Sequence, residues 1–297
     1  MTLAEPQLQS AYSHCLHIAQ SHYENFPVAS KLLNKQLRLP ISAVYAFARS
    51  ADDFADEGDL SQAQRLKLLN EYIVELDQIK KTLAQTPPAV LHPSNNPIFI
   101  ALADTIYSYK IPIDLFYDLI TAFKQDVTVQ HYTDFTDILN YCQHSANPVG
   151  RILLYLNKSA SAENLKDSDS ICTGLQLINF YQDIAQDIDE NNRLYIPLNE
   201  LNTFSVSKDN IKNHINNPHT QALYLAQIKR AQTIYQSGQA LACRLSGRFG
   251  LEIKMIYAGG ELMLNKLAKK SDSIYQRPRL TRLDKFKILW RGVFACL

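Results

Sequence analysis

Two short acidic stretches contain the side chains in this sequence that are best suited to chemistry. One carries Asp52 and Asp56, and the other carries Asp183 and Asp187. Residues four apart share one face of an α-helix, with their Cβ atoms about 5–6 Å apart. Two such helices facing each other would form a cage of carboxylate oxygens. Such a cage suits Mg²⁺, which binds few carboxylates and is completed by water and by phosphate groups.

The alternative is that both acidic pairs are solvated helix ends. With 29 acidic residues among 297, chance alone gives roughly three pairs at this spacing, so a single pair would carry little weight. Both pairs here interrupt apolar helical segments, and Arg49 lies one turn before the first pair. We therefore favour the metal-site interpretation.

Further polar residues continue each pair along its helix face. Tyr45, Arg49 and Asp53 accompany the first pair, and Gln176 and Asn179 precede the second at steps of three and four. The second segment is apolar nearly all round, which predicts an internal helix whose polar stripe faces a cavity or a partner stripe. Clustered carboxylates repel each other and burial raises their pKa values, so a divalent cation would remove the conflict.

Helical periodicity dominates the rest of the chain. The predicted helices cover a segment from Pro40 into the first acidic pair, followed by residues 60–83, 96–109, 113–127, 133–157, 168–190, 220–248, 251–268 and 282 to the end. We find no alternating strand pattern, no linker and no short repeat. The prediction is one all-α domain spanning residues 1–297.

Composition excludes several other classes. Thirty basic residues balance 29 acidic ones, so no affinity for nucleic acid is expected. The nine glycines form no GxGxxG or P-loop motif. Five scattered cysteines indicate reduced core thiols. Neither a signal peptide nor a membrane span is recognisable. A cytoplasmic protein is therefore predicted.

Carboxylate cages on helices suit diphosphate chemistry in particular. Mg²⁺ neutralises a leaving diphosphate and polarises its bridging oxygen. Ionisation of an allylic or cyclopropylcarbinyl diphosphate yields a carbocation, which needs apolar walls and the faces of aromatic rings. The candidate rings are Phe26, Tyr45, Phe47, Phe54, Tyr141, Phe180 and Tyr181.

Residues Tyr45–Glu57 and Leu175–Asp187 resemble the two aspartate-rich motifs of the squalene/phytoene synthase family, and Arg193–Pro197 follows at the family's expected place. The resemblance covers most of the chain, from about residue 12 to residue 284. It implies an isoprenoid synthase-type helical bundle around a central cavity. It also implies a prenyl diphosphate substrate and Mg²⁺ as the cofactor.

Two further stretches, Glu24–Ser30 and Tyr141–Arg151, are similar to the hydroxysqualene synthase branch of bacterial hopanoid biosynthesis. This resemblance implies a lyase that converts presqualene diphosphate into hydroxysqualene and diphosphate. Condensing members of the family often carry Ser where Asn25 stands and Arg where Gln182 stands. Both departures favour an enzyme that receives the cyclopropyl intermediate ready-made.

Two other functions stay open. One is a head-to-head condensing squalene or phytoene synthase, which is a prenyltransferase. The other is a non-catalytic lipid-binding or assembly factor with the same fold.

The resemblance also assigns roles to single residues. The expected metal ligands are Asp52, Asp53, Asp56, Asn179, Asp183 and Asp187, with Asp53 as a supporting acid. The expected catalytic residues are Arg49, Asp52, Tyr141 and Asp183. The expected substrate-binding residues are Phe26, Tyr45, Arg49, Tyr141, Gln176, Asn179, Gln182 and Arg193. We expect a water molecule near Tyr141, Gln182 or His144 to attack the cation.

The C-terminal segment from residue 282 is both amphipathic and basic. Its apolar residues include Leu283, Phe286 and Trp290, and its basic residues include Lys285 and Lys287. Such a helix either rests on an anionic bilayer, here the inner face of the membrane, or packs as an ordinary terminal helix. Both interpretations stay open on the sequence alone.

Overall fold

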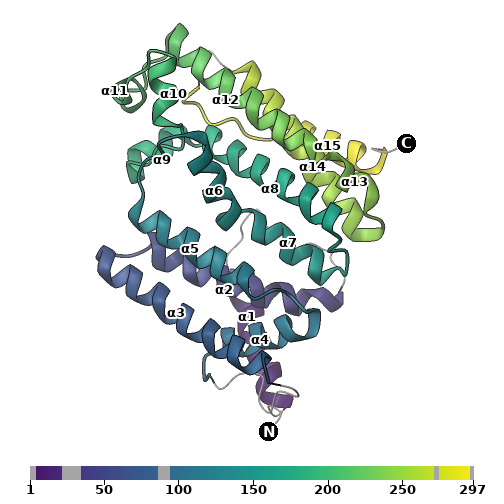
Figure 1. The fold of residues 1–297 in the computed structure, drawn as a ribbon. Coiled ribbons are helices and arrows are strands. Elements are labelled where there is room, and N and C mark those ends of the chain that lie inside the picture. The colour runs from purple at the N-terminus through teal and green to yellow at the C-terminus, as the bar shows by residue number, and fades with distance from the viewer. Residues whose placement is uncertain (1–4, 22–34, 86–93, 271–273, 295–297) are drawn as a thin grey trace. The chain divides into compact units, whose positions relative to one another are not determined.

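The computed structural model describes residues 5–21, 35–85, 94–270 and 274–294. These residues form helices joined by turns (Figure 1), and the described part contains no strand, only an isolated bridge between His131 and Leu194. The prediction of an all-α fold is confirmed. The helices are α1 (Glu5–Ser21), the short 3₁₀ helix η2 (Lys35–Leu37), α2 (Arg38–Asp56), α3 (Gln62–Leu83), α4 (Pro97–Tyr109), α5 (Asp114–Thr128), α6 (Phe135–Ser145), α7 (Asn147–Leu156), α8 (Ala162–Gln182), α9 (Ile184–Asn191), α10 (Leu198–Thr203), α11 (Lys208–Lys212), α12 (Pro218–Ser237), α13 (Gln239–Arg244), α14 (Gly247–Lys269) and α15 (Arg282–Phe294).

The chain divides into two compact units. Unit 1 comprises Met1–Thr128 and Pro148–Ser161, and unit 2 comprises Val129–Asn147 and Ala162–Leu297. The first acidic motif, on α2, therefore belongs to unit 1, and the second, at α8 and α9, belongs to unit 2. Each unit is described by itself below. The expectation of a single domain over residues 1–297 stays a prediction.

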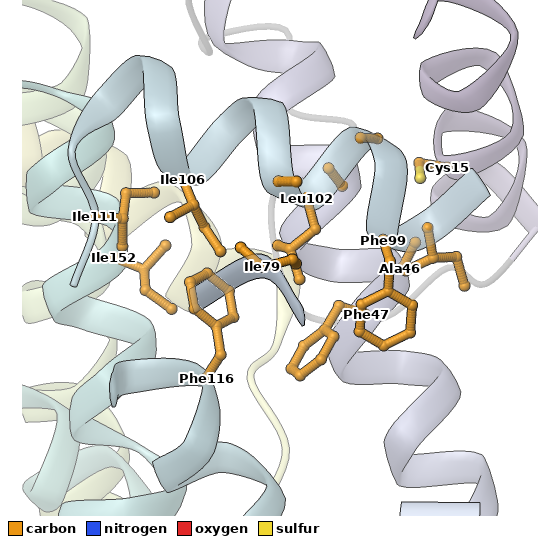
Figure 2. Packing of buried hydrophobic residues seen from close by; sticks show 14 of the residues in the cluster. Cys15, Ala46, Phe47, Ile79, Phe99, Leu102, Ile106, Ile111, Phe116 and Ile152 are labelled. Atoms are coloured by element: carbon orange, nitrogen blue, oxygen red, sulfur yellow. The ribbon is translucent and has the colours of Figure 1, made fainter. Parts of the chain in front are cut away.

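The core of unit 1 determines which way α2 is turned. Phe47 is fully buried, with its ring centroid 5.4 Å from that of Phe116 and 5.9 Å from that of Phe99 (Figure 2). The ring centroid of Tyr72 lies 5.4 Å from that of Phe47 in the same core. Full burial of such a side chain contributes about 1.5–3 kcal/mol. Since Phe47 anchors one side of α2 in the core, the opposite side is left to carry the polar row that begins at Tyr45.

Two predictions of one continuous helix are wrong, because the structure has a break within each predicted range. Residues 133–157 form α6 and α7, and residues 220–248 contain α12 and α13. The first break precedes Pro148, which has no N–H for a continuing helix. The second lies at Gly238, where an added Cβ would lie 2.7 Å from Ile171 Cγ1 and would also overlap a backbone oxygen of α8. Close packing on α8 thus requires glycine at this position.

The boundaries of several other helices agree more closely with the prediction from the sequence. The helices predicted for residues 60–83, 96–109, 113–127 and 251–268 correspond to α3, α4, α5 and α14. Capping explains several starts: Ser61 forms a capping box before α3, Asn96 caps α4, and Asp134 caps α6. Helix α8 begins at Ala162 instead of near Ser168, and the short helices α10 and α11 were not predicted.

Tyr235 lies at the centre of the core of unit 2. It is fully buried on α12, and its hydroxyl lies 3.1 Å from the carbonyl oxygens of both Ile256 and Tyr257 on α14. The side chain fits only because glycines face it. A Cβ added at Gly260 would lie 2.5 Å from Tyr235 Cζ.

We expect Gly260→Ala to lower the free energy of unfolding by about 1–3 kcal/mol, because the added methyl group would overpack this core. Gly259→Ala is the matched control on the same helix. Its Cβ would meet only Ile288 Cδ1 at 3.7 Å, so the gain in helix propensity, up to about 1 kcal/mol, should dominate. Urea unfolding of both variants checks the prediction. Equal stability of the two proteins would contradict this description of the core.

The cysteines correct one expectation. Cys15, Cys142 and Cys172 are free thiols, as predicted. Cys243 is disulfide-bonded, so the prediction of a reduced thiol is wrong at that position. Cys296 lies outside the described residues. Within the described part of the chain, no helix combines the length and the apolar character needed to cross a membrane.

Candidate active site

The first acidic motif presents one polar row on α2. Tyr45, Arg49, Asp52 and Asp56 follow one another at steps of four, three and four, so they share a helix face. Tyr45, Arg49 and Asp52 are partly exposed and Asp56 is exposed. The helix ends at Asp56, and Gly58 follows with φ of 71°, the left-handed conformation that glycine adopts at no steric cost.

Arg49 is the electrostatic centre of this motif. Its side chain is only 13% exposed, and its Nη2 lies 2.6 Å from Asp53 Oδ1. Its Nη1 lies 3.5 Å from Asp52 Oδ2, and its Nη2 also pairs with Glu57. Asp53 is therefore held by a guanidinium, and its expected role as a supporting acid stays a prediction. Asp52 makes the longer and weaker of these contacts.

Arg65 holds the end of α2 and was missed in the sequence. Its Nη1 donates to the carbonyl oxygens of Phe54 at 3.1 Å and Glu57 at 3.0 Å, and its Nη2 donates to that of Gly58 at 2.7 Å. A helix leaves its last carbonyls without internal partners, and a cation is favoured at that end. Arg65 thus fixes the backbone beneath Asp53 and Asp56. No pattern distinguishes this arginine from other surface arginines.

The second acidic motif lies at a helix junction. Helix α8 ends at Gln182 and α9 begins at Ile184, so the expectation of one continuous helix through Asp183 and Asp187 is wrong. The turn nevertheless keeps helical hydrogen bonding. The Asp183 N–H donates to the backbone carbonyl of Asn179 at 3.0 Å, and the Asp187 N–H donates to the Asp183 carbonyl at 2.8 Å. The spacing of four residues therefore still brings the two carboxylates together.

Arg277 binds the Asp183 carboxylate with both arms of its guanidinium. The distances are 2.6 Å from Nε to Oδ1 and 3.0 Å from Nη2 to Oδ2. Burial raises the pKa of Asp183, and the Arg277 charge and hydrogen bond oppose that rise. The two residues are separated by 94 positions, so no local pattern in the sequence could identify the pair.

Asp187, in the second acidic motif, has a strongly raised pKa. Burial, reinforced by the negative charge of Asp183, raises its pKa to about 7, although Arg193 and Arg277 favour its ionised form. Asn192 ends α9 in the left-handed conformation and turns the chain back, and the Arg193 N–H then donates to the Asp187 carbonyl at 3.0 Å. The structure therefore brings the predicted residue Arg193 to the second acidic motif.

The remaining predicted residues of this face are placed as follows. Gln176 is partly exposed and Asn179 is exposed, both on α8. The side-chain amide of Gln182 donates to the Pro278 carbonyl at 3.0 Å. It therefore ties the segment that carries Arg277 to the end of α8. The predicted substrate contacts of Gln176, Asn179 and Gln182 stay predictions.

Tyr141 belongs to an aromatic cluster within unit 2. It is buried, with its ring centroid 5.8 Å from that of Tyr132 and 5.9 Å from those of Phe180 and Tyr195. Phe180 and Tyr195 stack at 3.7 Å. Tyr141 and Phe180 were candidate rings from the sequence, and Tyr195 lies in the run that resembles the family. Tyr132 stands between helices, where periodicity gives no signal.

The other candidate rings lie elsewhere. Phe47 and Tyr181 are fully buried in the cores of unit 1 and unit 2, respectively. Tyr45 and Phe54 pack against the core of unit 1 while staying partly exposed. Phe26, with the whole stretch Glu24–Ser30, lies outside the described residues. His144 hydrogen-bonds through Nδ1 to the Asn140 carbonyl at 2.7 Å, a local helix contact.

Carboxylates suited to a divalent cation come from both units. Taken over the described residues, no three His, Cys, Asp or Glu side chains lie close enough together to hold a metal ion. Three of the predicted ligands belong to α2, in unit 1, and Asn179, Asp183 and Asp187 belong to unit 2. Their hard oxygens fit Mg²⁺. Burial and the neighbouring Asp183 charge both disfavour the ionised form of Asp187, and a bound cation would favour it.

Comparison with known proteins identifies the family of this chain. A sequence model of the squalene/phytoene synthase family matches residues 19–286. Hydroxysqualene synthase of Zymomonas mobilis is 32% identical over 250 residues, covering 83% of this chain and 79% of that protein. Hydroxysqualene synthase of Sinorhizobium fredii is 30% identical over 278 residues, covering 93% and 89%.

A solved structure shows the same fold. The crystal structure of squalene synthase HpnC from Alicyclobacillus acidocaldarius matches with a TM-score of 0.80 and 30% identity, covering 90% of this chain and 97% of that one. The range matched by the family model, residues 19–286, includes both acidic motifs. The chain belongs to the squalene/phytoene synthase family, a family of enzymes that act on prenyl diphosphates.

Proposed function

We propose that this protein is a hydroxysqualene synthase that ionises presqualene diphosphate in the presence of Mg²⁺ and releases hydroxysqualene and diphosphate. The observation that carries the proposal is the 30–32% identity to two hydroxysqualene synthases over most of the chain. The two acidic motifs with their paired arginines support it.

In unit 1, Asp52 and Asp56 would bind Mg²⁺, and in unit 2, Asp183 and Asp187 with Asn179 would bind it. When bound, Mg²⁺ would supply Lewis-acid activation of the diphosphate leaving group. Arg49 would add a planar donor fork beside the phosphate oxygens. Its contacts with Asp53 and Asp52 hold that fork at the motif in advance, so binding loses little side-chain freedom.

In the reaction the carbon–oxygen bond to the diphosphate breaks, and its electron pair leaves with the diphosphate. Rearrangement of the cyclopropylcarbinyl cation is followed by attack of a water oxygen, which forms a new carbon–oxygen bond and releases one proton. The cluster of Tyr132, Tyr141, Phe180 and Tyr195 supplies aromatic rings in the unit that carries the second motif. Ring faces stabilise cations by about 0.5–2 kcal/mol each.

A condensing squalene or phytoene synthase is the second candidate. The 30% identity to the protein named squalene synthase HpnC favours it. Gln182 weighs against it, because condensing members often carry Arg there and the Gln182 amide here donates to a backbone carbonyl. The cytoplasmic location expected from the sequence stays a prediction.

Product analysis tests the proposal. We expect the purified protein with Mg²⁺ and presqualene diphosphate, without NADPH, to give hydroxysqualene as the main lipid by mass spectrometry. In H₂¹⁸O the product should gain a single ¹⁸O, because the hydroxyl oxygen comes from solvent. Farnesyl and geranylgeranyl diphosphate supplied alone should remain unchanged.

Three outcomes would contradict the proposal. Squalene as the main product, or consumption of farnesyl or geranylgeranyl diphosphate, would assign the condensing function. Absence of turnover with each substrate, in a folded protein that still binds the lipid, would assign the non-catalytic lipid-binding function. The Asp52→Asn variant is the matched control and should leave presqualene diphosphate unreacted.

A further inference from the structure

Helix α15 packs on α14 (Figure 1), and the residues that approach α14 include Asp284, Ile288 and Gly292. Asp284 is buried and pairs with Lys266 of α14 at 2.6 Å. Gly292 is also buried, and an added Cβ there would lie 2.7 Å from Met255 Cγ. Ile288, on the same side, approaches Gly259. We call the side formed by Asp284, Ile288 and Gly292 the inner face.

The opposite side carries the large apolar side chains. Leu283 is 74% exposed, Phe286 67%, Leu289 48% and Trp290 61%. Steps of three and four place these residues on one surface of the helix. A terminal helix that served only the core would bury its leucines and aromatic rings and expose Asp284. This helix does the reverse, and an apolar patch of this kind indicates an interaction surface.

Basic residues border the apolar patch. Arg282, Lys285, Lys287 and Arg291 are all exposed. Lys287 and Arg291 lie one turn apart along one border, and Lys285 lies on the other. Arg291 has a distant acidic neighbour, Glu261, at 3.9 Å. Asp284, the acidic residue of this helix, points inward to Lys266. The whole chain has a net charge of only +1, so this concentration of positive charge is local.

We propose that this outer face, formed by Leu283, Phe286, Leu289 and Trp290 with their basic borders, binds the surface of an anionic lipid bilayer. An apolar strip flanked by cations is the pattern of a helix that lies in the membrane interface, with rings among the acyl chains and lysines at the phosphate groups. A symmetric contact between two copies would oppose the same basic borders, and like charges disfavour it.

The proposal goes beyond the proposed reaction and does not depend on it. A surface-bound enzyme would meet a prenyl diphosphate where such a lipid partitions. The contact we propose is peripheral, because it is made by the exposed side of α15 while the other side of the helix packs on α14.

The single tryptophan of the chain, Trp290, makes the test direct. The full-length protein is titrated with vesicles of phosphatidylcholine alone and of phosphatidylcholine with 30% phosphatidylglycerol. We expect at least tenfold stronger binding to the anionic vesicles, a blue shift of the Trp290 emission and quenching by lipids brominated on their acyl chains. Binding should weaken as salt is raised.

Two pairs of substitutions separate the contributions. Leu283→Ser with Phe286→Ser keeps the fluorescent probe and should weaken binding at least tenfold, and Lys285→Gln with Lys287→Gln should reduce the salt dependence. Ile215→Ser with Leu225→Ser, which replaces two other exposed apolar residues of unit 2, is the matched control and should bind as the unchanged protein does.

Three results would overturn the proposal. The first is an unchanged Trp290 emission with anionic vesicles. The second is equal vesicle binding by the Leu283/Phe286 variant and the unchanged protein. The third is a dimer, seen by analytical ultracentrifugation, that the Leu283/Phe286 variant abolishes while the unchanged protein ignores vesicles. That last result would assign the face to self-association.

Discussion

Replacing Asp187 with asparagine is expected to stabilise the metal-free protein at pH 8 and to lower the turnover of the enzyme with Mg²⁺ at least about 100-fold. The cause is the pKa of about 7, which burial and the neighbouring Asp183 charge produce. Because this folded-state pKa lies above the ordinary value of 3.8, the stability linked to the protonated carboxyl is complete below about pH 4 and is lost as the pH rises through 7. At pH 8 the Asp187 carboxylate is ionised in the folded chain, although burial and the Asp183 charge disfavour the ionised form.

The size of this effect follows from the two pKa values. Their difference corresponds to at most about 4 kcal/mol, and we expect asparagine to recover roughly 1–3 kcal/mol of it. Each kcal/mol raises the melting temperature by about 2–4 °C in a chain of this size class. Thermal melts in EDTA should show the gain at pH 8 and little gain at pH 4. The exposed residue Asp59 provides the control substitution Asp59→Asn, for which the two melts should match the unchanged protein.

The Asp187→Asn variant should lose enzymatic activity although it gains stability. The second acidic motif would lose a proposed metal ligand. Changes beside metal ligands already reduce metal affinity or activity by about 10–100-fold, so we expect turnover to fall at least about 100-fold. Calorimetric titration of the Asp187→Asn variant with Mn²⁺ and diphosphate should show the matching loss of binding. An equally active variant, or one less stable than the unchanged protein at pH 8, would refute this assignment.

Arg49 is expected to tolerate no substitution, including the one that keeps its charge. We expect both Arg49→Gln and Arg49→Lys to reduce kcat/KM by on the order of 10²–10³, the usual effect of removing a donor that stabilises developing negative charge. Lysine fails because a point charge cannot reach Asp53, Asp52 and Glu57 as the guanidinium fork does.

Stability should also fall in these variants. The Arg49 side chain is 13% exposed and that of Asp53 is 31% exposed, so Arg49→Gln leaves a partly buried carboxylate without its cation. We expect a loss of about 1–3 kcal/mol in the free energy of unfolding. Arg49→Gln combined with Asp53→Asn should recover most of that stability and none of the activity. Urea unfolding and steady-state kinetics measure the two effects.

An exposed ion pair provides the comparison for Arg49. Lys80 and Asp114 lie 3.2 Å apart with both side chains largely exposed, and Lys80→Gln should cost less than about 1 kcal/mol. If Arg49→Gln were as mild as Lys80→Gln in both measurements, the central role of Arg49 in the first motif would be wrong.

Several features of this protein were determined by the sequence alone, because their physics is local. The helical period places Tyr45, Arg49, Asp52 and Asp56 on one face whatever surrounds them. Caps such as Ser61 and Asn96 act within three residues, so the starts of α3 and α4 could be predicted. The two acidic motifs carried the family resemblance, which the family match over residues 19–286 confirms.

Only the tertiary structure decided which charges meet. Arg277 reaches Asp183 across 94 residues, and Arg65 reaches back from α3 to the end of α2. Such pairs depend on how helices pack, and packing also produces the burial that raises the pKa of Asp187. The same holds for α15. Its sequence allows either side to face inward, and the close approach of Gly292 to Met255 turns Leu283 and Trp290 to solvent.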